Sequence, residues 1–152
     1  MDLAVVALTF GAIFLIELPD KTFIATLVMA TKYRPLYVWI GVSLAFLVQT
    51  IVAVALGGAA RLLPQELVHG VAGFMFFAGA VVLFRQARSA DASEDEAEAE
   101  FAAKTKPASG ARVVLTCFLI LFAAEWGDLS QLLTASLVAK YGQHVSVFIG
   151  AL

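Results

Sequence analysis

Two acidic tetrapeptides lie within apolar stretches of this chain. The first is ELPD, with Glu17 and Asp20, and the second is EWGD, with Glu125 and Asp128. A spacing of three residues sets two carboxylates side by side on a helix face. Carboxylate oxygens suit hard divalent cations such as calcium, magnesium or manganese, whereas zinc and copper sites generally use histidine or cysteine. Each pair is therefore predicted to hold a cation.

The surroundings of these acids are typical of a lipid bilayer. Hydrophobic residues make up 61% of the 152 positions and charged residues only 14%, against roughly 45–50% and about 25% in soluble domains. A charge near the centre of a spanning helix costs about 2.5–3.5 kcal/mol on insertion scales. Four such acids favour a site that binds or transports cations over a purely structural role.

Four apolar stretches and the start of a fifth predict an all-α integral membrane protein. The stretches are Leu3–Thr31, Leu36–Ala60, Leu67–Phe84 and Val113–Ala139. The first and fourth are longer than a perpendicular crossing of about 30 Å needs. Pro19 and Gly127 lie within these two stretches, so we expect both to be tilted or broken, with freed carbonyls beside the acids.

The two acidic motifs belong to an internal repeat. Both 125 − 17 and 128 − 20 equal 108, and Thr26 meets Thr134 at the same offset. Repeats of three helices each enter the membrane in opposite orientations, with a site near the midplane where they meet. The sequence therefore predicts two inverted-topology repeats of three transmembrane helices. The predicted divisions are 1–88 for the first repeat, 89–111 for a linker and 112–152 for the start of the second repeat.

The second repeat stops early. After Gly150 only two residues remain, whereas the first repeat continues for two helices beyond Gly41. We therefore expect the chain to be truncated or to be a fragment. The linker is acidic and rich in small residues, which predicts disorder. Lysines and arginines flank it, so the positive-inside rule places it in the cytoplasm and the amino terminus outside.

Neutral oxygen donors and one lysine accompany the acids. The candidate donors are Thr22, Thr26, Gln49, Ser130, Gln131 and Thr134. Lys21 can pair with Glu17 at i, i+4, but Leu129 replaces it in the second motif. Four acids and one lysine sum to −3 when all are ionised, so a divalent cation, protons or both must reduce that charge. Alternate binding of metal and protons would couple the two flows.

The twin motifs resemble those of uncharacterised protein family 0016, whose motif Glu-x-Gly-Asp-(Lys/Arg)-(Ser/Thr) occurs twice. The likeness covers nearly all of the chain, with Pro19 at the glycine position and Leu129 at the basic position. It implies six helices in two inverted halves around a cytoplasmic loop. It also implies export of Mn²⁺, with Ca²⁺ second, from the cytoplasm in exchange for protons. The cation ligands that it implies are Glu17, Asp20, Glu125 and Asp128, supported by Thr22 and Ser130.

Such exchangers occur in bacterial, Golgi and thylakoid membranes, and we expect a multi-pass protein of the bacterial inner (plasma) membrane. An exporter of small organic solutes such as amino acids is an alternative; it would have a larger apolar pocket and no metal dependence. A non-transporting scaffold subunit is another, and it would tolerate Glu17→Gln and Asp128→Asn. The oligomeric state stays open, a homo-oligomer included.

Other classes of protein fit less well. No nucleophile, cofactor fingerprint or catalytic histidine neighbours the motifs, so we expect no enzyme, no catalytic residue and no permanently bound cofactor. The net charge is −2 and no basic patch with aromatic residues occurs, so nucleic acid is not an expected partner. The expected partners are a divalent cation, protons and the lipid bilayer.

Overall fold

The computed structural model consists of helices throughout its described part. Described are residues 1–17, 21–64, 66–70, 73–74, 77, 80–81, 84, 98–105 and 109–152. The helices are α1 (Leu3–Glu17), α2 (Lys21–Lys32), α3 (Pro35–Ala60), α6 (Ala111–Ala124), α7 (Leu129–Tyr141) and α8 (His144–Ala151). No strand occurs in these residues, and the all-α class is confirmed.

Both long apolar stretches that carry the acidic motifs form two helices instead of one. The axes of α1 and α2 are bent by 71°, and those of α6 and α7 by 73°. At the second bend Gly127 has φ of +81°, a left-handed conformation that glycine adopts without steric cost. Breaks were predicted in both stretches and are confirmed. Pro19 itself lies outside the described residues.

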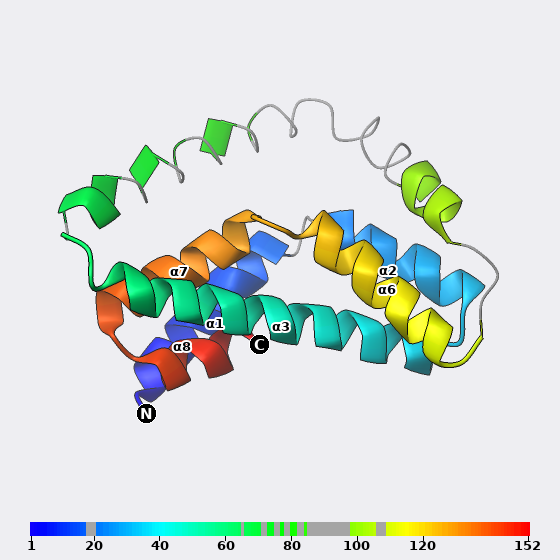
Figure 1. Ribbon diagram of the computed structural model, residues 1–152, viewed down its shortest axis with the longest axis horizontal. Coiled ribbons are helices and arrows are strands. Elements are labelled where there is room, and N and C mark those ends of the chain that lie inside the picture. Colours follow the sequence, from blue (N-terminus) through cyan, green and yellow to red (C-terminus); the bar gives the residue numbers. More distant parts are fainter. Residues whose placement is uncertain are drawn as a thin grey trace.

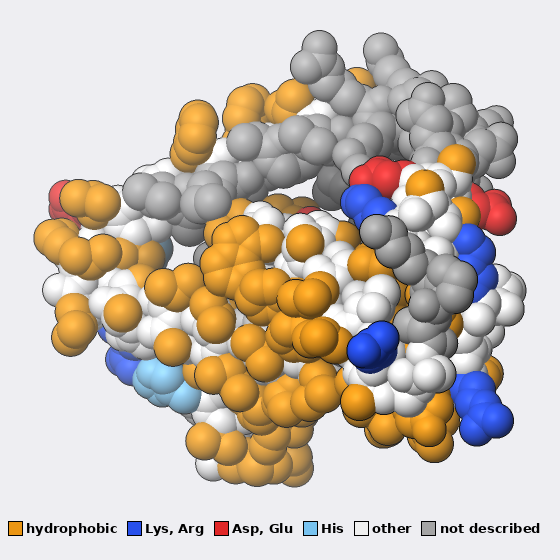
Figure 2. Space-filling model, turned by 45° about the vertical axis from the view of Figure 1, so that its right-hand side comes forward, with side chains coloured by type: hydrophobic (Ala, Val, Ile, Leu, Met, Phe, Trp, Pro, Cys, Tyr) orange, Lys and Arg blue, Asp and Glu red, His pale blue; other side chains and the backbone are white. Residues whose placement is uncertain are grey.

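The described helices have the length and apolarity of a membrane protein. Among the described helices, only α3 is long and apolar enough to cross a bilayer by itself. If α1 with α2 and α6 with α7 each count as one span, the number of spans rises to three. Apolar side chains also spread over the outer surface (Figure 2), and Phe10, Phe23 and Trp39 are all more than half exposed. An extended apolar surface of this kind indicates contact with lipid. The predicted stretch Leu67–Phe84 is described only in part.

The helices of the two halves pack across each other. The long helix α3 contacts α6 and α7, while α8 contacts α1 (Figure 1). A Cβ atom on Gly41 of α3 would lie 2.6 Å from the carbonyl oxygen of Val114 in α6. A Cβ atom on Gly150 of α8 would lie 2.5 Å from the carbonyl oxygen of Val6 in α1. Val6 and Val114 are themselves separated by the repeat offset, so the two contacts correspond.

The connections fall at two ends of the molecule. Arg61, after α3, lies against Gly142, after α7, and the backbone N–H of Asp2 donates to Ser146 Oγ at 2.9 Å. The amino terminus therefore shares one end with the carboxyl ends of α3 and α7. The α2–α3 turn lies at the opposite end with the amino terminus of α6 (Figure 1).

Part of the predicted linker is ordered, which differs from the expectation of disorder. Residues 98–104 are helical, and Phe101 is only 4% exposed, as part of a buried apolar cluster that includes Tyr33 and Val113. Lys32 Nζ donates to the carbonyl oxygen of Ala102 at 2.7 Å. One large aromatic side chain and one long-range hydrogen bond thus anchor a segment whose overall composition is polar.

The glycine contacts give a stability prediction. Gly41→Ala should destabilise the protein by about 1–3 kcal/mol, because its Cβ would clash with Val114 and with Cys117 Cβ at 2.8 Å. Gly11→Ala is the matched control, since nothing lies within 4 Å of a Cβ there and alanine favours a helix by up to about 1 kcal/mol. Thermal unfolding in detergent measures both. Equal midpoints for the two variants would contradict close packing at Gly41.

Candidate metal site

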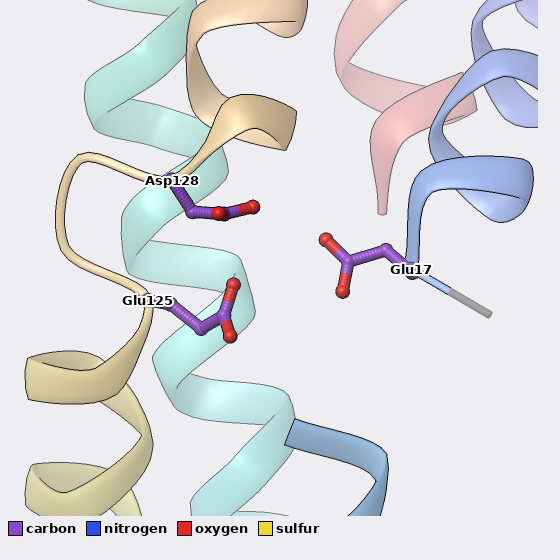
Figure 3. A group of neighbouring side chains, drawn as sticks. All are labelled: Glu17, Glu125 and Asp128. Atoms are coloured by element: carbon purple, nitrogen blue, oxygen red, sulfur yellow. The ribbon is translucent and has the colours of Figure 1, made fainter. Parts of the chain in front are cut away.

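Three carboxylates from the two halves of the chain converge. Oxygen atoms of Glu17, Glu125 and Asp128 all lie within 4.8 Å of one another. Glu17 is the last residue of α1, while Glu125 and Asp128 belong to the connection between α6 and α7. Figure 3 shows the three side chains pointing toward a common space from these elements. Three of the four predicted acidic ligands are therefore brought together.

The second acidic pair is assembled by a turn and not by a helix face, so the i, i+3 helical explanation was wrong for this pair. Helix α6 ends at Ala124, and Asp128 caps the amino terminus of α7. The backbone N–H of Asp128 donates to the carbonyl oxygen of Glu125 at 3.1 Å, which closes the turn. Asp128 Oδ2 accepts a hydrogen bond from the Ser130 N–H at 3.2 Å. The break that was predicted from Gly127 is what re-aims both carboxylates.

Two predicted site residues cannot be placed. Asp20 lies outside the described residues, and of Lys21 only the backbone, as the first residue of α2, is described. The predicted Asp20 ligand and the predicted pairing of Lys21 with Glu17 therefore stay predictions.

A cavity of about 550 Å³ adjoins the carboxylates, and Glu17 is among its lining residues. Four of the predicted oxygen donors also line it, namely Gln49, Ser130, Gln131 and Thr134. The other two, Thr22 and Thr26, are absent from its described wall. Thr26 Oγ1 donates to the carbonyl oxygen of Thr22 at 2.8 Å, and Thr134 Oγ1 makes the same bond to Ser130. The same threonine-to-backbone bond therefore occurs in each half, but only Ser130 and Thr134 of the second half line the cavity.

Sequence reasoning missed two polar residues of the wall. Ser43 and Thr50 of α3 line the cavity, and Thr50 follows Ser43 by seven residues, two helical turns. Both lie in a span without any charged side chain. A search for hydroxyl and amide side chains that recur on one face of this apolar helix would have found them together with Gln49.

Side chains complete the hydrogen bonding of the interrupted backbone. Gln49 Nε2 in α3 donates to the carbonyl oxygen of Phe122 at 3.1 Å. Gln131 Nε2 donates to the carbonyl oxygen of Glu125 at 2.8 Å, and Gln131 Oε1 accepts from the Gly127 N–H at 3.3 Å. Without water, each unsatisfied backbone group would cost several kcal/mol. These amides therefore make a broken helix tolerable next to the acids.

The electrostatics of the cluster favour a cation. Glu125 is only 3% exposed, and its carboxyl group lies beside two others, which repel it when all are ionised. Asp128 caps the amino terminus of α7. This terminus is the positive end of a helix dipole, and it offsets only part of the negative charge that the ionised carboxylates would carry. Carboxylates, hydroxyls and amides form a hard, oxygen-rich donor set that fits Mn²⁺, Ca²⁺ or Mg²⁺.

Comparison with known proteins identifies the class of protein. The profile described as divalent cation/proton antiporter GDT1 matches residues 5–91 and 113–152. Together with the apolar broken helices, this match indicates an integral membrane protein from a family of cation/proton antiporters. The chain belongs to the GDT1 divalent cation/proton antiporter family. The resemblance drawn from the twin motifs is thereby confirmed. No solved structure matches significantly.

Individual relatives agree with this assignment. Protein PAM71, chloroplastic, of Arabidopsis thaliana is 29% identical over 96% of this chain and 44% of its own length. GDT1-like protein sll0615 of Synechocystis is 31% identical over 82% of this chain and 65% of its own length. GDT1-like protein 5 of Arabidopsis thaliana is 31% identical over 83% of this chain and 67% of its own length. The chain thus spans about half to two thirds of the length of these relatives.

The cap at Asp128 gives a second prediction. Asp128→Asn and Asp128→Ala both remove the charge, but only asparagine keeps an oxygen that can accept from the Ser130 N–H. We expect Asp128→Ala to be less stable than Asp128→Asn by about 1 kcal/mol, the usual worth of an amino-terminal cap. Denaturation in detergent with a chelator present measures the difference. Equal stability of the two variants would show that the side chain does not cap α7.

Proposed function

We propose that this site binds Mn²⁺, with Ca²⁺ as the next candidate, and exchanges it for protons during export from the cytoplasm. The observation that carries the proposal is the meeting of Glu17, Glu125 and Asp128 within 4.8 Å. Two ionised carboxylates about 4 Å apart repel by about 4 kcal/mol at an effective dielectric constant near 20. Either a divalent cation or protons relieve this repulsion, so binding of one displaces the other.

The proposed architecture is two inverted-topology repeats with the site at their interface. The corresponding contacts of Gly41 with α6 and of Gly150 with α1 support it, because a two-fold relation between halves would generate such a pair. We assign the first repeat to residues 1–88, the cytoplasmic linker to 89–111 and the start of the second repeat to 112–152. The protein then spans the plasma membrane of a bacterium, with its amino terminus on the outer side.

Asp20 is proposed as the fourth carboxylate ligand. It stands where Asp128 stands in the second motif, and Glu17, its partner in the first motif, already belongs to the cluster. Four carboxylates with neutral oxygens from Ser130 and Gln49 would supply the six or more oxygen ligands that Ca²⁺ takes.

One observation favours a second candidate function. The cavity wall contains many apolar side chains, among them Phe10, Phe14 and Phe46, and its volume falls in the range of sites for small organic ligands. An exporter of amino acids would have such a wall, with the carboxylates holding the ammonium group. Its cargo would compete with metal for the same acids.

Binding by the chain itself is the first test of the metal proposal. A metal that binds only the folded state at a concentration of 100 Kd stabilises it by about 2.7 kcal/mol. We expect Mn²⁺ or Ca²⁺, but not alanine, to raise the unfolding temperature in detergent, and Glu125→Gln to abolish the rise. Glu100→Gln is the control, because Glu100 is an exposed carboxylate paired with Lys104. Stabilisation by alanine and not by metal would contradict the metal proposal and favour the exporter of small organic solutes.

Exchange is tested after reconstitution into liposomes that contain a pH indicator. Mn²⁺ or Ca²⁺ added outside should drive protons out of the liposomes. We expect Glu17→Gln and Asp128→Asn to slow this flux at least about tenfold, since a loss of 1.4 kcal/mol in cation binding already corresponds to that factor. Glu100→Gln should retain it. Metal binding without any proton flux would refute exchange, and normal flux in both variants would refute the site.

A further inference from the structure

The connection that carries Glu125 and Asp128 is bridged by a single side chain. Gln131, in the first turn of α7, donates to the Glu125 carbonyl oxygen at 2.8 Å and accepts from the Gly127 N–H at 3.3 Å. Its amide therefore bonds one backbone group at the start of the connection and one in its middle. Both hydrogen-bonding ends of the amide face the backbone.

The bridged backbone is a weak point of the fold. Gly127 has a left-handed conformation with φ of +81°, and nothing lies within 4 Å of a Cβ built there. Packing therefore does not fix this residue, and glycine has the largest conformational freedom to lose. The Asp128 N–H bond to the Glu125 carbonyl oxygen closes the turn, and the two hydrogen bonds of Gln131 add the side-chain restraint on the segment between the two carboxylates.

We infer that Gln131 is a positioning residue for the cation site, acting through the backbone that aims Glu125 and Asp128. The inference rests on the proposed function and deepens it, because it assigns control of cation affinity to a residue that need not touch the cation. Partners that orient metal-binding side chains typically change metal affinity by 10–100-fold when mutated. Gln131 occupies such a place.

The first motif has no counterpart of this bridge at the corresponding position. At the repeat offset Gln131 meets Phe23, whose ring is 61% exposed and has no hydrogen-bonding group. The first motif therefore lacks an amide at the position from which Gln131 makes its bridge. Control of affinity by an amide of α7 is thus a property of the second half.

The test replaces Gln131 by methionine, which keeps the length of the side chain and removes both hydrogen bonds. Gln143→Met is the matched control. Gln143 is also part-buried, donates to Asp2 Oδ2 at 3.3 Å and accepts from Ser146 Oγ at 2.9 Å, but it lies between α7 and α8. Three quantities are measured on each variant in detergent. They are the hydrogen exchange of the 122–132 peptide without metal, the Mn²⁺ affinity, and the electron paramagnetic resonance line shape of bound Mn²⁺.

We expect Gln131→Met to speed exchange in this peptide and to weaken Mn²⁺ binding about 10–100-fold, with a broadened spectrum of the bound ion. Gln143→Met should leave all three quantities unchanged, even if it lowers the unfolding temperature as much as Gln131→Met does. Unchanged exchange in Gln131→Met would overturn the bridge itself. Faster exchange with wild-type affinity would overturn the positioning role. Failure of the wild-type protein to bind Mn²⁺, with exchange still altered by Gln131→Met, would instead reject the proposed function.

Discussion

The rest of this molecule depends on three carboxyl groups whose oxygen atoms lie within 4.8 Å of one another. Carboxylates at this separation in a poorly polarisable surrounding repel each other by several kcal/mol, and they lose hydration that lipid and apolar side chains do not replace. Around these groups lie oxygen-bearing side chains and the amino terminus of α7. In the second half, helix α6 ends at Ala124, directly before Glu125. A continuous helix through EWGD would have satisfied its own backbone but would have aimed the carboxylates elsewhere.

Ending a helix inside an apolar environment creates a second problem, because the freed backbone groups need partners. For the backbone of the second half, two glutamines supply them. Gln49 of α3 donates to the last turn of α6, and Gln131 of α7 donates to the connection between α6 and α7. Polar side chains in the spanning helices therefore have two tasks. Some face the cavity, whereas others complete a backbone that bends by 73°.

Much of this arrangement followed from the sequence. Apolar length predicted the helices, and a glycine inside an overlong stretch predicted the bend at Gly127, because backbone chemistry is local. The repeated spacing of the acids predicted that the four carboxylates would meet, and three of them, Glu17, Glu125 and Asp128, lie together. Ser43 and Thr50 were missed since their role depends on which face of α3 turns to the cavity, a tertiary property. Docking of residues 98–104 was also missed, because one buried aromatic side chain, Phe101, outweighs a polar composition.

The corresponding glycine contacts bear on how the molecule is held together mechanically. Since α3 of the first half rests on α6, and α8 of the second half rests on α1, each half is completed by helices of the other. Cohesion between the halves therefore comes from interlocked helix surfaces and does not require an unbroken chain between them. A polypeptide cut between the halves would still present the same complementary surfaces to its other piece.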